Sequence, residues 1–532
     1  MSTLKSKFYI TTSIAYANAA PHIGYALEIL QADVLARFHR LLGEDVFFLS
    51  GTDENGTKIK KTAEKTKMAP QDFVDKNSVK FRELLDRLNV SNDDFIRTTD
   101  QIRHWPAAQK IWKKLVEAGD IYKDSYEGYY CVGCEAYLTE KDLIDGKCPN
   151  HQKAPEKIKE ENYFFRLSKY SDQIQKLIES DELKIVPESR KNEILNVVKI
   201  GLKDISFSRS KTVLDWGVPV PDDETQTMYV WCDALANYIS ALGYGDDFKT
   251  ELNSEASELS SVLELSSVKF QKYWPADIHL IGKDILRFHA AIWPAMLLSA
   301  KLPLPKKIFV HGFITSGGQK MSKSVGNVVD PFEVVDKYKS VDALRYFLLK
   351  EIPSGGDGDF SYERFEEVYQ ADLANGLGNL TARVLAMAEK SIFNFQFSIF
   401  NQSSIFNFQT TTNKTWEKYE NALNDFKLNE ALETTRKFMS ACDEYIEKNK
   451  PWQMEGEDKA KVIYDLLESL RHIAWMIKPF MPETSDKIFE QLFADEKERN
   501  IELNKTLPEA QKWGGLKSGV KIKKEAGLFP RL

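Results

Sequence analysis

Three cysteines and one histidine have the spacing of metal ligands. In "CVGCEAYLTEKDLIDGKCPNH", Cys131 and Cys134 form a C-x2-C pair, and thirteen residues later Cys148 and His151 form a C-x2-H pair. Two short pairs of soft ligands with a reversing "LIDGK" turn between them suit a tetrahedral zinc ion. Four protein ligands leave no open coordination position, so we expect one structural Zn²⁺ per chain. The alternative is a chance grouping of reduced thiols.

A histidine near the N-terminus occupies a position that suits phosphate binding. "FYITTSIAY" alternates as a strand does, and "HIGYALEILQADVLARFHRLLG" has apolar residues at three- and four-residue spacing, which predicts a helix that begins near His22. The free N–H groups and the dipole of a helix start attract phosphate, and Gly24 lets it approach closely. For a lone histidine, an ordinary helix-start residue is the simpler interpretation.

A second polar loop follows a later strand. "KKIFVHGFITSGGQKMSKSVGN" predicts a strand that ends at two glycines and is followed by lysines and hydroxyl groups. Such a glycine-hinged loop can close over a polyphosphate and then open, although read alone it is also typical of a solvated turn. The polar side chains of this loop are Lys320, Ser322, Lys323 and Ser324.

The elements that carry these residues predict an α/β protein. Strand, helix and strand ("DVFFLSG") occur within the first fifty or so residues, which indicates a parallel crossover that binds ligands at the carboxyl ends of its strands. "DIHLIGKDILRFHAAIWPAMLLSA" repeats strand, turn and helix, and from residue 361 the helical period dominates. We therefore expect a parallel-sheet Rossmann-type catalytic domain, split by a zinc-bearing insertion and followed by an α-helical bundle. The expected ranges are 1–115 and 221–305 for the two halves, 116–220 for the insertion, 306–360 for a connecting region with the lysine loop, 361–510 for the bundle and 511–532 for a tail.

Composition excludes several classes of protein. Apolar residues make up 42% and charged residues 28%, and no apolar run approaches the length that spans a bilayer. The first residues lack the zones of a signal or transit peptide, so we expect a cytoplasmic protein. Five cysteines, an odd number, argue against a disulfide framework, and the net charge of −7 argues against a generally basic nucleic-acid binder. The repeated hexapeptide "SIFNFQ" is interpreted as a loop insertion between helices.

Taken together, "PHIGYA" and "KMSKS" resemble the two signatures of class I aminoacyl-tRNA synthetases. "TTSIAYANAAPHIGYALEILQADVLARFHR", "GTDENGTKI", "YVWCDALANYI", "IGKDILRFH", "KMSKSVGNV" and the cysteine segment follow, in order, the pattern of the methionyl-tRNA synthetase family over essentially the whole chain. The two phosphate signals are about 300 residues apart, so chance agreement is implausible.

The resemblance implies that methionine and ATP form methionyl-adenylate and pyrophosphate, and that methionine then passes to the 3′ end of tRNA(Met). Mg²⁺ would accompany ATP. The catalytic residues implied are His22, Lys320 and Lys323. The ATP-binding residues implied are His22, Gly24, Tyr25, Gly282, Asp284, Ile314, Lys320, Ser322 and Lys323.

The resemblance also implies an amino-acid slot and an anticodon site. Asp53 would pair with the methionine ammonium, and aromatic side chains would favour a thioether modestly. The methionine-binding residues implied are Ile14, Tyr16, Asp53, Trp231, Ala234, Leu235, Tyr238, Ile285, His289 and Trp293. The anticodon residues implied are Asn379, Arg383 and Trp452, for which a core tryptophan and an ordinary surface pair are the alternative. A dimerising extension is not evident, so we expect a monomer.

One residue departs from the family pattern. The first signature usually ends in a second histidine or a small polar residue, and this chain has Tyr25, a phenol without positive charge at neutral pH. His22 or the loop lysines must then contribute more of the phosphate contact. The competing hypotheses are a synthetase for valine, leucine or isoleucine, a catalytically silent tRNA-binding paralogue, and a nucleotidyltransferase without an RNA partner. The insertion of roughly 100 residues leaves little room for an editing domain, and the helical last third argues against the nucleotidyltransferase.

Overall fold

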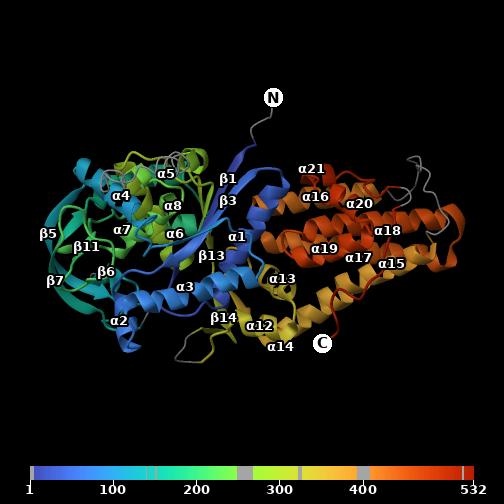
Figure 1. Ribbon diagram of the computed structural model, residues 1–532, viewed down its shortest axis with the longest axis horizontal. Helices are drawn as coiled ribbons and strands as arrows, with labels where there is room; N and C mark the ends of the chain where they lie inside the picture. The colour runs from blue at the N-terminus through green and yellow to red at the C-terminus, as the bar shows by residue number, and fades with distance from the viewer. Residues whose placement is uncertain are drawn as a thin grey trace.

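The computed structural model describes residues 5–138, 140–149, 152–247, 268–321, 326–391, 408–517 and 520–532. His151, Ser322, Lys323 and most of the two "SIFNFQ" copies lie outside these ranges. The molecule is elongated, with strands and short helices at one end and a bundle of long helices at the other (Figure 1). No helix among the described residues is long and apolar enough to cross a membrane.

A parallel sheet forms the centre of the first half. Its strand order is β2-β3-β1-β12-β13-β8, with β4 beside β3. Because β1 pairs with β3 on one side and with β12 on the other, the strand order reverses at β1, and ligands bind at the carboxyl ends of strands at such a point. The strands are β1 (Lys7–Thr12), β2 (Ala15–Tyr16), β3 (Asp45–Asp53), β4 (Asp94–Arg97), β8 (Lys184–Val186), β12 (Ile278–Gly282) and β13 (Lys307–His311).

The predicted first helix is confirmed. Helix α1 (Ile23–Leu41) covers the sheet, and most of its side chains are buried because it also packs against α13. His22 is its N-cap, and the chain turns beyond its end at Gly43, whose φ of 88° suits glycine. Helices α2 (Thr57–Lys65), α3 (Pro70–Arg87) and α4 (Trp105–Glu117) complete this half.

The insertion forms its own antiparallel sheet, in the order β6-β5-β7-β9. Its strands are β5 (Ile121–Cys131), β6 (Ala136–Leu138), β7 (Glu156–Phe165) and β9 (Ile205–Ser206), with the short helices η1 (Glu140–Asp142), η2 (Leu167–Tyr170), α5 (Ser171–Glu179) and α6 (Glu188–Lys199). Strand β8 lies within the range expected for the insertion, yet it pairs with β13 at the edge of the main sheet. Two apolar residues in a strand of three give too short a signal to assign this strand from sequence.

The chain then returns to the main sheet. It passes through β10 (Ser208–Ser210), β11 (Gln226–Met228), α7 (Val230–Ala234) and α8 (Asn237–Ser240). The helix expected after β12 is not one regular α-helix. It begins with a 3-10 turn, η3 (Lys283–Ile285), widens to a π-helical segment, η4 (Phe288–Ile292), and only then becomes α11 (Trp293–Ser299). π-helical segments of this kind often occur at functional sites.

The connecting region carries a small sheet with the order β15-β14-β16. These strands are β14 (Ile314–Ser316), β15 (Gln319–Lys320) and β16 (Gly358–Phe360), and helices α12 (Pro331–Tyr338), α13 (Val341–Glu351) and α14 (Tyr362–Val368) surround them. Gly317 and Gly318 have φ of 60° and 74°, which is the conformation of a two-residue hairpin turn.

Long helices make up the other half of the molecule, as predicted. They are η5 (Tyr369–Gly378), α15 (Asn379–Ser391), α16 (Phe408–Asn424), α17 (Leu428–Asn449), α18 (Gly456–Ile477), α19 (Pro482–Leu492), α20 (Glu496–Leu503) and α21 (Leu507–Ala510), with a short turn η7 (Pro451–Gln453). One hydrophobic core runs from α1 through α13 into this bundle. The buried Arg345 joins the halves, since it donates to Asp33 of α1 at 2.6 Å and to the carbonyl oxygen of Phe480 at 2.7 Å.

Candidate active site

The His22 imidazole folds over the first turn of α1. Its Nδ1 accepts a hydrogen bond from the Gly24 N–H at 3.0 Å, so the neutral ring carries its proton on Nε2. The side chain is exposed at the carboxyl edge of the sheet. A Cβ atom on Gly24 would lie 2.8 Å from His22 Cε1, so glycine is what allows the ring to lie here. The first four backbone N–H groups of α1 already donate within the protein, so what the helix start presents is the imidazole Nε2–H together with the positive end of the helix dipole, which suits an anion.

The two described ends of the lysine loop lie beside this helix start. The Ile23 N–H donates to the Val329 carbonyl oxygen at 3.1 Å, and the Met321 methyl group lies 4.0 Å from the position of a Gly24 Cβ. The Lys320 backbone pairs with Thr315 in the glycine hairpin. The structure therefore brings the loop expected to close over phosphate to the helix that would bind it. The loop residues Ser322 and Lys323 themselves lie outside the described residues.

Strand β12 ends in a glycine that lies close to an acidic side chain. A Cβ on Gly282 would lie 2.8 Å from Asp284 Oδ1 and 3.6 Å from His311 Nε2, so a glycine is needed at this position. Asp284 is exposed, and Ile314 is buried in the next strand but one. These three predicted nucleotide residues lie on neighbouring elements at the carboxyl edge of the sheet.

Sequence reasoning missed a buried ion pair at the same edge. Glu28 of α1 accepts from the Ser13 N–H at 2.7 Å and pairs with His311 Nε2 at 3.1 Å. Burial alone would lower the pKa of His311, but the hydrogen bond and charge of Glu28 outweigh burial and raise it. This pair holds α1 to the end of β13. An acidic residue four positions after Gly24, on the same helix face, was the available signal.

Tyr25 lies in the core. Its ring is 8% exposed and meets the Phe81 ring edge to face at 4.9 Å, and its hydroxyl lies 3.3 Å from the Ser50 hydroxyl. Burial raises the pKa of this phenol. The side chain therefore packs against the sheet from α1, and its contact with ATP stays a prediction.

Several residues predicted to form the methionine slot, on α7, α8 and η4, contact one another or neighbouring residues. Tyr238 donates to His289 Nε2 at 2.7 Å, and His289 Nδ1 donates to the Ile285 carbonyl oxygen at 3.0 Å. Burial lowers the pKa of His289 to about 4, so the ring is neutral at physiological pH. Trp231 stacks on Phe288 with ring centroids 3.7 Å apart. The slot is therefore lined by aromatic rings whose protonation does not change near neutral pH.

Further predicted slot residues lie at the end of α7, on α11 and beside β3. Ala234 ends α7 and Leu235 follows it, and both are buried. The Trp293 indole at the start of α11 donates to buried His279 at 3.3 Å. Ile14 lies beside β3. Its Cγ2 atom is 2.9 Å from the position that a Cβ atom on Gly51 would occupy.

Two buried carboxylates, one of them that of the predicted slot residue Asp53, lie close to a single asparagine. Asp53 ends β3 and is 5% exposed, and Asp233 on α7 is fully buried. Asn55 connects them, since its backbone N–H approaches Asp53 at 3.5 Å and its side-chain amide donates to Asp233 at 2.8 Å. Burial first, and then the Asp233 charge, raise the pKa of Asp53 well above its ordinary value. The positive charge of a bound ammonium group would favour the ionised form of Asp53 and lower its pKa again, so the arrangement suits a cationic group. Sequence reasoning did not identify Asp233.

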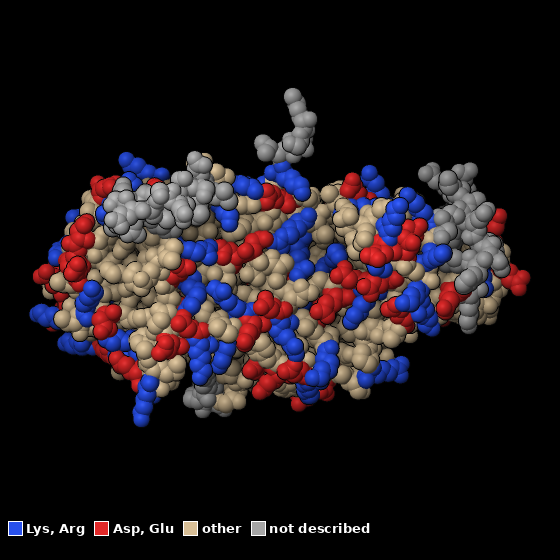
Figure 2. Space-filling view, viewed as in Figure 1, with Lys and Arg blue, Asp and Glu red and all other residues tan. Residues whose placement is uncertain are grey.

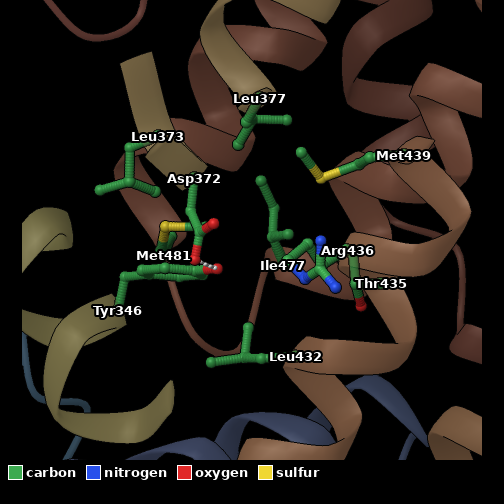
Figure 3. A pocket seen from close by; sticks show the side chains of 10 residues that line it. All are labelled: Tyr346, Asp372, Leu373, Leu377, Leu432, Thr435, Arg436, Met439, Ile477 and Met481. Carbon is green, nitrogen blue, oxygen red and sulfur yellow. Dashed lines mark hydrogen bonds between the residues drawn. The ribbon is translucent and has the colours of Figure 1, made fainter. Parts of the chain in front are cut away.

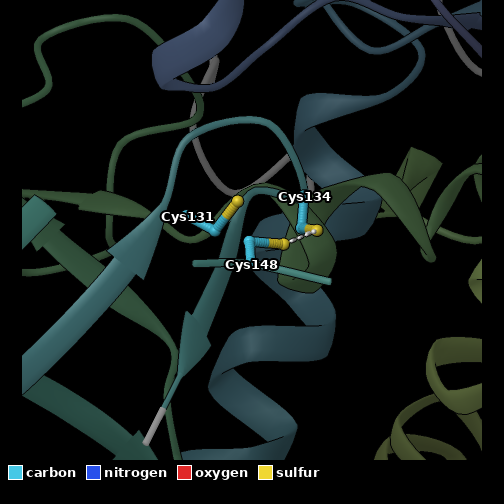
Figure 4. Close-up of side chains that lie close together, drawn as sticks. All are labelled: Cys131, Cys134 and Cys148. Atoms are coloured by element: carbon cyan, nitrogen blue, oxygen red, sulfur yellow. Dashed lines mark hydrogen bonds between the residues drawn. The ribbon is translucent and has the colours of Figure 1, made fainter. Parts of the chain in front are cut away.

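The three described cysteines of the predicted metal site lie together (Figure 4). The Sγ atoms of Cys131, Cys134 and Cys148 are all within 4.8 Å of one another, and the Cys134 and Cys148 sulfurs are 3.5 Å apart, too far for a disulfide bond. The predicted "LIDGK" reversal is confirmed by paired hydrogen bonds of 2.9 Å between Ile144 and Lys147. His151 lies outside the described residues. The thiols fit a thiophilic metal ion.

The predicted anticodon residues lie on the helical half. The Trp452 side chain in η7 is 53% exposed, so its interpretation as a core tryptophan is wrong. Asn379 is exposed at the start of α15, whereas Arg383 is paired with Asp443 at 3.3 Å and Glu447 at 2.7 Å. Charges of both signs are interspersed on the face that Figure 2 shows, so no broad basic surface appears there.

A small pocket between η5, α13, α17 and α18 does not suit a substrate (Figure 3). Half of its lining residues are Leu and Met. The polar groups at this pocket already have protein partners. The Tyr346 hydroxyl donates to Asp372 at 2.9 Å, and Lys350 pairs with the same carboxylate at 2.9 Å. We therefore regard it as a packing gap in the bundle.

Comparison with known proteins agrees with this geometry. The family described as "tRNA synthetases class I (M)" matches residues 8–157 and 151–385, and "Anticodon-binding domain of tRNA ligase" matches 407–526. The methionine--tRNA ligase of Caldanaerobacter subterraneus subsp. tengcongensis is 45% identical over 535 residues, covering 99% of this chain and 79% of the relative. That of Brucella melitensis is 44% identical, covering 93% of this chain and 94% of the relative.

A solved structure shares the fold over the whole length. Mycobacterium tuberculosis methionyl-tRNA synthetase in complex with methionyl-adenylate superimposes with a TM-score of 0.87 at 36% identity, covering 99% of this chain and 100% of that one. Family match, identity and fold agree with the helix-start histidine, the lysine loop and the buried aspartates described above. The chain therefore belongs to the methionyl-tRNA synthetase family of class I aminoacyl-tRNA synthetases.

Proposed function

We propose that this chain activates methionine with ATP and transfers it to the 3′ end of tRNA(Met). The observation that carries the proposal is the meeting, at one edge of the sheet, of a helix start with an exposed imidazole and a group of buried aromatic side chains beside two buried carboxylates. The first site suits a nucleotide, and the second suits an amino acid with an apolar side chain. Relatives named methionine--tRNA ligase support the choice of amino acid.

In the first step, the methionine carboxylate oxygen forms a bond to the α-phosphorus of ATP, and the bond from that phosphorus to the pyrophosphate oxygen breaks. The protein contributes positioning and stabilises the charge that builds on the phosphate oxygens. His22 and Lys323 would face the α-phosphate, and Lys320 would hold the departing pyrophosphate. Gly282 and Asp284 would contact the ribose, and the Ile314 backbone the adenine. Mg²⁺ bound with ATP would offset the pyrophosphate charge.

In the second step, a terminal ribose hydroxyl of tRNA attacks the methionyl carbonyl and AMP leaves. Selection of methionine rests on the aromatic slot, which distinguishes side chains by only about 1–3 kcal/mol per methylene group. Norleucine, which has the same length without sulfur, should therefore be activated to a measurable extent. Asp53, with Asp233 behind it, would bind the ammonium group.

The cysteine cluster fits a structural zinc ion. Cys131, Cys134 and Cys148 supply three thiolates, and His151 would be the fourth ligand. When bound, zinc supplies folding energy to the insertion. No chemical step passes through it.

The helical half would bind the RNA partner. Exposed Trp452 can stack on an unpaired anticodon base, and Asn379 and Arg383 can read base edges once Arg383 leaves its carboxylate partners. We propose that the chain acts as a monomer in the cytoplasm.

Pyrophosphate exchange with each of the twenty amino acids tests the proposal. Exchange should be led by methionine and should need no RNA, and charging of tRNA(Met) should follow when RNA is added. Exchange led by valine, leucine or isoleucine would assign the chain to another specificity. Binding of tRNA without any exchange would instead indicate a silent paralogue.

A further inference from the structure

Glu135, the residue after Cys134, connects the cysteine turn to β2 and α2. It lies in the turn between β5 and β6, has a φ of 49° and is 3% exposed. Its Oε1 accepts from the Tyr16 hydroxyl at 3.0 Å and from the Lys58 N–H, and its Oε2 accepts from the Tyr130 hydroxyl. A buried carboxylate is thus satisfied by three donors from three separate elements.

The Glu135 carboxylate supplies the hydrogen-bond acceptor that the N-cap residue of helix α2 lacks. The N-cap of α2 is Gly56, which has no side chain to accept from the first turn, and Glu135 accepts from the second residue of the helix instead. A negative charge at this end also interacts favourably with the helix dipole. A Cβ on Gly56 would lie 2.7 Å from the Tyr16 hydroxyl oxygen and 3.0 Å from Glu135 Oε1, so glycine is what lets these groups meet.

Tyr16 connects Glu135 to the amino-acid slot. In the parallel pairing of β2 and β3, Tyr16 is the register partner of Asp53. Its hydroxyl proton is shared between Glu135 and the Asn55 carbonyl oxygen, which is 2.8 Å away. The Lys58 ammonium lies 5.1 Å from the centre of the same ring. The ring is therefore held at its hydroxyl and on its face, directly beside Asp53.

We propose that Glu135 is a positioning residue for the amino-acid substrate, which holds Tyr16 beside Asp53 from the turn that also carries Cys134. The inference rests on the proposed function, which places Tyr16 and Asp53 at methionine. Glu135 does not touch the substrate itself. It acts by fixing a ring that would otherwise rotate about its side-chain torsions, so its loss should weaken methionine binding more than the chemical step.

The test is Glu135→Gln, measured by methionine-dependent pyrophosphate exchange. An amide has one acceptor oxygen in place of two, so Tyr16 and Tyr130 cannot both keep their hydrogen bonds to it unchanged. The KM for methionine should rise about tenfold, while the KM for ATP and kcat stay within twofold. Glu156→Gln is the matched control, because Glu156 also joins the insertion to α2, through Lys61, but its side chain is exposed. It should leave all three constants unchanged.

A double-mutant cycle separates positioning from general damage. Tyr16→Phe removes the hydroxyl that Glu135 accepts from, so adding Glu135→Gln to Tyr16→Phe should raise the methionine KM by less than twofold further. If Glu135→Gln does not fold, Tyr130→Phe replaces it, since this change only releases Oε2, and the methionine KM should rise about threefold. An unchanged methionine KM in the folded variant, or fully multiplicative effects in the cycle, would overturn the inference. A wild-type chain that makes no methionyl-adenylate would overturn the proposed function as well.

Discussion

At the scale of single residues, His22 has two separate tasks. Its Nδ1 caps α1, and its Nε2–H would face phosphate. His22→Asn separates them, because asparagine also caps helices but offers no imidazole. We expect a melting temperature close to that of the wild type and an exchange rate lower by about a hundredfold, as for the loss of one preorganised donor to a developing charge. His22→Ala, the control, should lose the same rate and about 1 kcal/mol of stability as well. Exchange within a few-fold of wild type in His22→Asn would remove the imidazole from the mechanism.

Trp452 gives a second prediction at this scale. Because its side chain is exposed, Trp452→Ala should leave the unfolding transition nearly unchanged. If the indole stacks on a base, Trp452→Ala should weaken the free energy of tRNA binding by about 1–3 kcal/mol and leave the rate of pyrophosphate exchange unchanged. Charging, exchange and a melting curve measured on one preparation check this. Normal charging of tRNA(Met) would exclude the residue from the anticodon site.

At the scale of elements, the cysteine cluster and its turn form a unit that a bound metal ion would stabilise. We expect one zinc per chain by elemental analysis, and Cys148→Ala should lose it and lower the melting temperature before it alters the chemical step. Cys442→Ala is the control, since Cys442 is buried in α17, away from the cluster. It should keep the metal. Protein purified with reduced cysteines and no metal would refute the prediction.

At the scale of the whole molecule, buried ion pairs join segments that are distant in the chain. Glu468 of α18 accepts from the N–H groups of Gly514 and Gly515, both at 2.8 Å, and from Arg471 at 2.6 Å. Burial would raise the pKa of Glu468, but the hydrogen bonds and charges of His472 and Arg471 outweigh burial and hold the pKa well below its ordinary value. The carboxylate therefore fixes the C-terminal segment against the bundle.

The depressed pKa has a consequence for stability against pH. A carboxyl whose folded pKa lies below its unfolded value contributes stability that is complete above the unfolded value, 4.5, and is lost as pH falls toward the folded value. Glu468→Gln should therefore lower the free energy of unfolding by about 3 kcal/mol at neutral pH, and the difference from wild type should shrink as pH falls below 4.5. Urea unfolding of both proteins across this range is the measurement. A difference independent of pH would contradict the assigned role.

The features that could be predicted from the amino-acid sequence are those whose physical causes are local. Helix α1 with its His22 cap and the Ile144–Lys147 reversal each depend on side chains and φ angles within about four residues, so periodicity and turn chemistry predict them. The apolar pattern before Gly317 and Gly318 predicts one strand, whereas the structure divides it into β13 and β14 and makes the two glycines a hairpin turn. The parallel sheet and helical bundle follow from the same periodicities over longer segments, and the family resemblance supplied the roles of the site residues.

Contacts between polar groups that are distant in the chain could not be predicted, because they depend on tertiary packing. Glu28 and His311 are 283 residues apart, Asn55 and Asp233 are 178 apart, and Tyr16 and Glu135 are 119 apart. No spacing of residues along the sequence predicts these pairings, because each depends on how the sheet, insertion and helices pack. The same is true of β8, which is too short to identify alone and becomes a strand because β13 offers it an open edge. Buried polar groups need partners, and packing chooses them.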